Sequence, residues 1–137
     1  MNKKVWLGFI AVFVTFVILD FVVNGLLMKT AWESTANLFR PDMMSKMYVF
    51  YIMNLVGAFF FSFIFSKGYE GKGIGEGIRY GFYIGVWLST GMAYGTYAMV
   101  AIPYYMALQW FLYGVVEYMI AGVVLATVFG KKAEAAK

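Results

Sequence analysis

Four long apolar segments constrain this chain of 137 residues more than any other feature. They lie at about residues 5–28, 48–66, 77–101 and 106–129, and each approaches or exceeds the roughly 20 residues that an α-helix needs to cross a bilayer. Only 13% of the residues are charged, against about 25% in an average soluble domain. We therefore predict one domain over residues 1–137: an all-α membrane protein that forms a four-transmembrane-helix bundle with short loops.

The longest polar segment, residues 29–46, separates the first two apolar segments. Pro41 interrupts it, because proline restricts the residue before it and suits the start of a helix. Residues 31–39, which precede this break, predict a short helix at the membrane interface between the first two spans. Trp32 and Phe39 would be its apolar anchors.

Small residues recur along one side of the third predicted span. At about 100° per residue, a helix places them together and places large aromatic side chains roughly opposite. In a bilayer, a side without large side chains lets another backbone approach closely. We call this side the helix-packing face, and its members are Gly77, Gly81, Gly85, Ser89 and Gly95.

The distribution of Lys and Arg predicts how the chain is oriented. Of the eleven such residues, only Lys29, Arg40 and Lys46 lie on the side shared by residues 29–46 and the turn at Pro103. The other side carries the rest, and short loops rich in Lys and Arg face the cytoplasm. We expect a multi-pass protein of a bacterial inner (plasma) membrane with both termini in the cytoplasm. The net charge of +4 follows from this distribution and does not indicate nucleic-acid binding.

The chain contains neither cysteine nor histidine. This excludes disulfides, thiolate nucleophiles, cysteine-ligated metals, bis-histidine haem and the usual zinc or copper sites. The glycine-rich stretch GYEGKGIGEG lacks the Lys-Ser/Thr ending and the preceding strand of a phosphate-binding loop. We therefore predict no metal and no cofactor. An enzyme is the third choice of function, because nothing pairs a nucleophile with a base.

Two carboxyl side chains lie inside the predicted spans, Asp20 in the first and Glu117 in the fourth. Charged groups are costly inside a membrane, so such residues are candidates for function by default. With a rise of about 1.5 Å per residue, Glu117 falls near the midplane and Asp20 in the outer third. The span interiors offer no Lys or Arg to neutralise Glu117, and we expect its carboxyl to be protonated at neutral pH.

Several roles remain open for these two carboxyls. Glu117 is a structural hydrogen-bonding group, a proton or cation site, or a contact to a partner subunit or ligand. Asp20 takes part in such a site, faces a water-filled outer vestibule, or pairs with Lys29 or Arg40.

Further polar side chains gather at the same outer depth, which predicts an outward-facing pocket for a ligand or ion. Asn24 lies one helical turn beyond Asp20 on the same face, and Asn54 lies in the outer half of the second span. The candidate pocket residues are Asp20, Asn24, Asn54, Tyr94, Tyr97, Tyr113 and Glu117.

The segments LDFVVNGLLMK, AWESTANLF and GYEGKGIGEGIRYGFYIG resemble those of small uncharacterised four-helix proteins of bacterial inner membranes. Several of these share a polar residue late in the first helix, a loop with tryptophan and a glycine-rich lead into the third helix. The resemblance covers most of the chain and implies the fold and the location, but no activity. Small multidrug exporters also have four helices, but their membrane carboxylate lies in the first helix, whereas Glu117 lies in the fourth.

Two functions from different classes fit this sequence. The first is a non-enzymatic assembly or accessory subunit of a membrane complex that binds through the helix-packing face. The alternative is a small oligomeric transporter or channel with a proton- or cation-linked Glu117. The partners expected are the lipid bilayer and either further copies of the chain or other membrane subunits, without nucleic acid.

Overall fold

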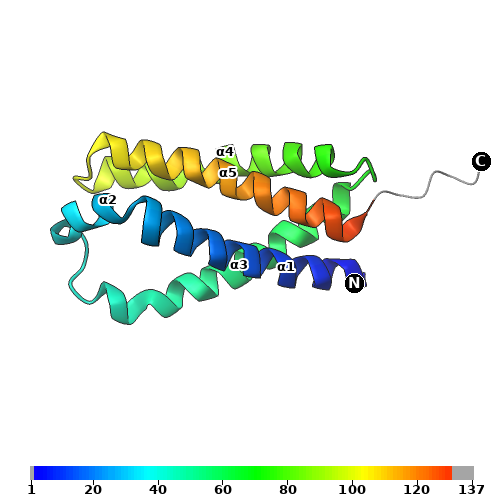
Figure 1. The fold of residues 1–137 in the computed structure, drawn as a ribbon, viewed down its shortest axis with the longest axis horizontal. Coiled ribbons are helices and arrows are strands. Elements are labelled where there is room, and N and C mark those ends of the chain that lie inside the picture. Colours follow the sequence, from blue (N-terminus) through cyan, green and yellow to red (C-terminus); the bar gives the residue numbers. More distant parts are fainter. Residues whose placement is uncertain (1, 131–137) are drawn as a thin grey trace, which may run out of the picture.

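The computed structural model describes residues 2–130, and nearly all of them are helical (Figure 1). This part of the chain contains no strand. Its α-helices are α1 (Lys3–Asp20), α2 (Lys29–Ser34), α3 (Met47–Gly68), α4 (Ile74–Met99) and α5 (Tyr104–Phe129). The all-helical fold class is thus confirmed. Lys131, Lys132 and Lys137, which enter the orientation argument, lie outside the described residues.

Three of the described helical segments are long and apolar enough to cross a membrane. They are Lys3–Leu27, Met43–Gly68 and Tyr104–Phe129. Helix α4 has the same length as α5, 26 residues, but it is less apolar because glycine, tyrosine, serine and threonine occupy many of its positions. Its role as a further span therefore stays a prediction.

The first of these segments changes its winding immediately after Asp20. Phe21–Leu27 is π-helical, and the segment closes with the Met28 N–H donating to the Val23 carbonyl five residues back, at 2.7 Å. At its other end, the basic start of the chain belongs to the helix. The Asn2 side chain caps α1 by accepting a hydrogen bond from the Lys4 N–H at 2.9 Å.

The segment between α1 and α3 is helical in pieces rather than one helix over residues 31–39. Helix α2 ends at Ser34, and short 3₁₀ turns follow at Ala36–Leu38 and Met43–Lys46. The Trp32 ring lies 5.0 Å from Phe39 and 5.7 Å from Trp110 of α5. Both predicted anchors therefore pack against the bundle instead of extending into the interface.

The turn between α3 and α4 is ordered by a single carboxylate. The side chain of Glu76 accepts hydrogen bonds from the backbone N–H groups of Glu70, at 2.7 Å, and of Lys72, at 3.1 Å. Gly71 and Gly73 have φ values of 77° and 88°, which side chains disfavour. The glycine-rich stretch is thus a defined helix connection.

Helices α4 and α5 form a close antiparallel pair through the helix-packing face. A side chain at Gly77 would collide with the Gly122 backbone, and one at Gly81 would collide with the backbone of Tyr118. Backbones touch here because neither helix has a side chain in the way. Gly95 differs, since a side chain there would meet nothing within 4 Å, and the buried series continues at Ala93 instead.

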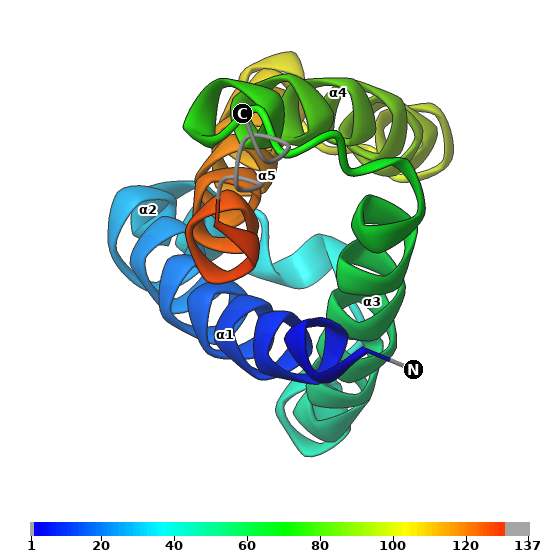
Figure 2. The same ribbon diagram turned by 90° about the vertical axis from the view of Figure 1, so that its right-hand side faces the viewer.

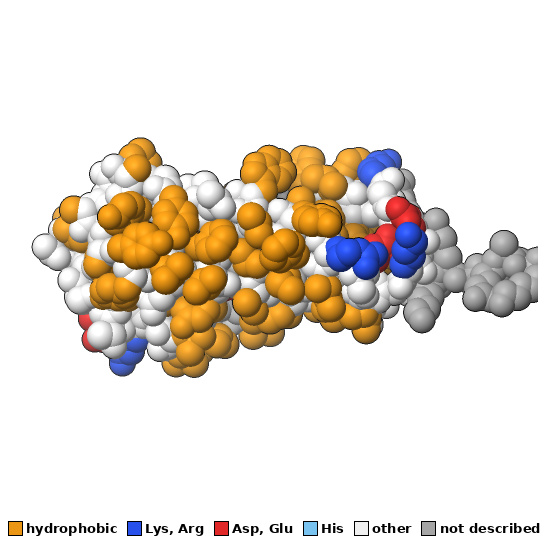
Figure 3. Space-filling model, turned by 90° about the horizontal axis from the view of Figure 1, so that it is seen from above, with side chains coloured by type: hydrophobic (Ala, Val, Ile, Leu, Met, Phe, Trp, Pro, Cys, Tyr) orange, Lys and Arg blue, Asp and Glu red, His pale blue; other side chains and the backbone are white. Residues whose placement is uncertain are grey.

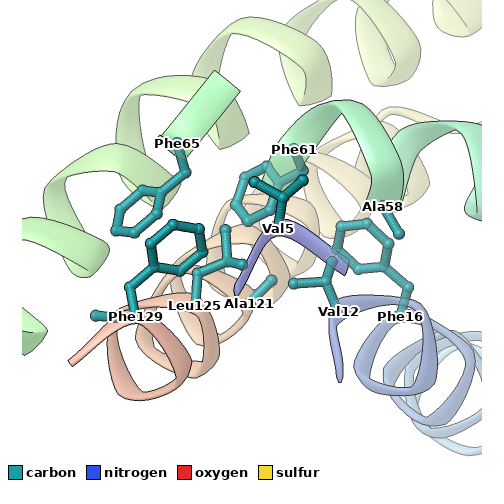
Figure 4. Packing of buried hydrophobic residues seen from close by; sticks show 10 residues of the cluster. Val5, Val12, Phe16, Ala58, Phe61, Phe65, Ala121, Leu125 and Phe129 are labelled. Atoms are coloured by element: carbon teal, nitrogen blue, oxygen red, sulfur yellow. The ribbon is translucent and has the colours of Figure 1, made fainter. Parts of the chain in front are cut away.

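Two buried cores follow one another along the bundle. The first core joins α1, α3 and α5, as Figure 4 shows, and consists of Val5, Val12, Phe16, Ala58, Phe61, Phe65, Ala121, Leu125, Ala126 and Phe129. The second core joins the π segment, α2, α4 and α5, and consists of Val23, Met28, Ala31, Ala93, Ile102, Met106, Ala107 and Trp110. It contains no residue of α3.

The two ends of the bundle differ in charge. One end, which we call the basic end, carries Lys3, Lys4, Lys67, Lys72 and Arg79. The opposite end, which we call the α2 end, consists of residues 29–46 and the turn between α4 and α5. Figure 3 shows hydrophobic side chains over the middle of one face and charged ones toward its ends, as expected for a membrane protein.

Candidate functional site

Three polar side chains from three different helices meet inside the bundle. The Asn54 side-chain amide on α3 donates to the Asp20 carboxyl on α1 at 2.8 Å. The carboxyl groups of Asp20 and of Glu117 on α5 lie close enough to share a hydrogen bond. All three side chains are half-buried. We call Asp20 and Glu117 the carboxyl pair, and together with Asn54 they form the polar site.

A hydrogen bond within the carboxyl pair requires a proton. A carboxylate only accepts hydrogen bonds, so a bond between two carboxyls needs a proton on one of them. Two ionised carboxyls in contact would also repel each other strongly in a half-buried site. Asp20 and Glu117 can therefore share a hydrogen bond only in a state in which one of them is protonated.

The ion pairs of the described chain all lie away from the polar site. Lys29 approaches Glu33 to 4.0 Å, Arg40 pairs with Asp42, and Lys72 lies 2.6 Å from Glu70. The alternative in which Asp20 pairs with Lys29 or Arg40 is therefore not realised. Both cations have nearer carboxylates at the α2 end, and the Asp20 carboxyl accepts its hydrogen bond from the Asn54 amide.

Asn24 lies one helical turn beyond Asp20 and connects that turn to α2. Its side-chain amide donates to the Asp20 carbonyl at 3.3 Å, and its side-chain oxygen accepts from the Trp32 indole N–H at 3.1 Å. The π-helical winding starts between Asp20 and Asn24, and such windings are frequent at functional sites. Trp32 was missed by sequence reasoning as a partner of Asn24, because the seven residues between them include the change of helix.

The three tyrosines predicted to line the pocket lie toward the α2 end. The hydroxyl groups of Tyr94 and Tyr104 are 3.2 Å apart, and the Tyr97 ring lies 5.7 Å from the Tyr104 ring. Tyr113 packs against the second core. The structure therefore groups Tyr94 and Tyr97 around the turn between α4 and α5, while Asp20, Asn54 and Glu117 form the polar site.

Aromatic rings cover the polar site on the side of the basic end. The rings of Phe16, Phe61 and Tyr118 lie 5.5 to 5.9 Å from one another. Tyr80 of α4 lies 4.7 Å from the Phe61 ring, and its hydroxyl donates to the Phe61 carbonyl at 2.7 Å. We call Phe16, Phe61, Tyr80 and Tyr118 the aromatic layer. Sequence analysis missed it, because the run of phenylalanines in α3 does not reveal which ring points inward.

The described residues contain no group of three or more acidic side chains arranged to hold a metal ion. The polar site offers the two carboxyls and one amide. A polar depression lies at the basic end, where Glu70, Lys72, Glu76 and Arg79 line the turn between α3 and α4. There the acidic and basic side chains are mixed, and Glu76 is occupied by the turn itself.

Comparisons with protein-family models, with curated proteins and with solved structures gave no match to this chain. The geometry of the polar site is therefore the basis on which a function is argued.

Proposed function

We propose that this protein is a small membrane transporter or channel in which the carboxyl pair binds a proton or another cation. The observation that carries the proposal is the proximity of Asp20 and Glu117, two acids from different helices, within an apolar bundle. Acids inside a membrane are costly and mark ion or proton pathways. A purely structural hydrogen bond needs only one polar group on each helix, and an amide such as Asn54 already supplies one.

The chemistry of the pair supports exchange between a proton and a cation. When the shared proton leaves, two carboxylates face each other, and their repulsion favours a cation in its place. The Asn54 amide donates to Asp20 and stabilises its charged form in that state. The site therefore alternates between a protonated state and a cation-bound or hydrated state.

The membrane arrangement that fits this function is a four-span bundle. Helix α4 matches α5 in length and is buried against it along four successive turns, which supports its insertion as a further span. Lys3, Lys67 and Arg79 at the basic end favour the cytoplasmic side for that end and for both chain ends. The bacterial inner membrane is the location that goes with this orientation.

A second candidate function, an accessory subunit or a subunit of a homo-oligomer, is favoured by one exposed surface. From Met47 to Gly57 no residue of α3 is buried, and a side chain at Gly57 would meet nothing within 4 Å. This half of α3 replaces the helix-packing face as the surface for a partner, because α5 covers Gly77 and Gly81. Mild-detergent extraction, a native gel and mass spectrometry of the band would distinguish partner subunits from further copies.

Titration of the carboxyl pair tests the proposed function. The infrared C=O band of protonated carboxyls, followed from about pH 5 to about pH 9, is expected to lose intensity in the parent protein. In Glu117→Gln this pH-dependent band should disappear, because one acid of the pair is gone. In proteoliposomes the same variant should lose proton or cation flux.

The matched control is Glu33→Gln, which removes an exposed carboxylate of α2. It should keep both the titration and the flux of the parent protein. Identical infrared titration and identical flux in the parent and in Glu117→Gln would overturn the proposal.

A further inference from the structure

We infer that the aromatic layer is the barrier that must part before an ion can pass between the carboxyl pair and the basic end. This inference rests on the proposed function, and it adds the residues that control passage.

The basic-end side of the polar site is closed by rings and then by the first core. Phe16 and Phe61 are 6% and 4% exposed, and Val12 and Leu125 beyond them are fully buried. Phe16 lies one turn from Asp20 and Phe61 two turns from Asn54, both toward the basic end. A proton or cation that leaves the carboxyl pair in this direction meets apolar side chains.

Two hydrogen bonds hold the helices together below the aromatic layer. The Ser62 hydroxyl of α3 donates to the Val5 carbonyl of α1 at 2.8 Å. The Lys4 ammonium group donates to the Phe129 carbonyl at the end of α5 at 2.7 Å. These bonds connect α1 to α3 and to α5, so hydrogen bonds and apolar packing together hold the helices on the basic-end side of the polar site.

On the other side of the polar site, α3 leaves the bundle. Figures 1 and 2 show its first half diverging from α4 and α5 toward the α2 end. Tyr51 and Val56 in this half are 53% and 54% exposed, and Asn54 bonds this half to Asp20 of α1. The second core packs the α2 end between the π segment, α2, α4 and α5, so α3 is held by packing only on the side of the aromatic layer.

Within the aromatic layer, a single hydrogen bond joins α4 to α3. The Tyr80 hydroxyl holds the Phe61 carbonyl across the gap between α4 and α3, while the neighbouring layer contacts are ring contacts without hydrogen bonds. A change of charge at the carboxyl pair acts on α3 directly through Asn54, seven residues from Phe61. Release of that amide would let α3 move relative to α4.

Neighbouring phenylalanines of α3 provide a matched test of this barrier. In proteoliposomes with a pH gradient, Phe61→Ala should raise the passive proton leak by more than about tenfold, because it opens the layer. Phe60→Ala should leave the leak unchanged, since Phe60 is 51% exposed and lies outside the layer. Tyr80→Phe removes the hydroxyl bond without a cavity and should give a smaller increase.

The combined variant Phe61→Ala with Glu117→Gln shows whether the leak passes the carboxyl pair. Loss of the leak in this variant supports the inference, whereas a persisting leak shows a general loss of packing and overturns it. Equal leaks in Phe61→Ala, Tyr80→Phe and Phe60→Ala overturn it as well, even when the infrared titration upholds the proposed function. If Phe61→Ala fails to fold, the proton leak of Tyr80→Phe is compared with that of Phe60→Ala. A larger leak in Tyr80→Phe supports the inference, and equal leaks overturn it.

Discussion

The half of the bundle near the basic end and the half near the α2 end are built from the same helices but packed differently. In the basic-end half, α3 contributes Ala58, Phe61 and Phe65 to the first core. In the α2-end half, α3 contributes nothing to the second core, and α2 packs there with the π segment, α4 and α5. The polar site lies at the boundary, where α3 changes from buried to exposed. A half-buried polar site is expected at such a boundary, since the packed core and the exposed half of α3 meet there.

The largest effect is expected where α4 and α5 touch by their backbones. Gly81→Leu should lower the free energy of unfolding by more than about 3 kcal/mol, because its side chain would collide with the backbone at Tyr118. Gly95→Leu should have little effect, since its position is open. Unfolding in detergent micelles, followed by far-ultraviolet circular dichroism, measures both. Equal stability of the two variants would show that α4 and α5 do not pack through the helix-packing face.

A comparison within α3 tests the difference between the two halves directly. Phe65→Ala should lower the free energy of unfolding by about 3 kcal/mol, because Phe65 is 3% exposed in the first core. Phe50→Ala, the same substitution at a residue that is 48% exposed, should change it by less than about 0.5 kcal/mol. The same unfolding measurement applies. A comparable loss at Phe50 would mean that the first half of α3 is covered, by a partner or by a further copy.

The smallest effect is expected at Tyr69, at the edge of the first core. Its hydroxyl is buried and has no hydrogen-bond partner among the described residues, so Tyr69→Phe should be neutral or slightly stabilising. Burial, with a smaller contribution from the charge of Glu76, raises the pKa of Tyr69. Its contribution to stability is therefore complete below about pH 10 and is lost as the pH rises through the folded-state pKa.

The comparison for Tyr69 is a pair of alkaline unfolding curves. Tyr69→Phe should lose less stability above about pH 10 than the parent protein. A steeper alkaline loss in the variant would contradict the burial of the hydroxyl.

The sequence predicts the helices well because long apolar segments leave few alternatives. The packing of Gly77, Gly81 and Gly85 against another helix could also be expected. That α5 is their partner could not, since a side without large side chains accepts any helix that fits. Gly95 was included by helical angle alone, whereas the contact with α5 follows every fourth residue and so continues to Ala93.

The contact between Asp20 and Glu117 could not be predicted from their positions. Counting residues from the helix ends places them at different depths, because that estimate treats each helix as upright. In the structure the helices cross at an inclination, as Figure 2 shows, and the two carboxyls meet. The exposure of the first half of α3 could not be predicted either, because an apolar segment has the same composition whether it faces lipid or another helix.

The π-helical segment Phe21–Leu27 decides where a change of chain length would disturb the polar site. Its hydrogen bond from Met28 to Val23 spans one residue more than an α-helical bond. Deleting one residue there would let α-helical winding replace the wider turn and would leave the helices on either side nearly in register. Deleting one residue between Phe16 and Asp20 would instead turn Asp20 by about 100° relative to Phe16. Asp20 would then leave Glu117 while Phe16 stayed in the first core, so this deletion would separate the two acids as effectively as replacing one of them.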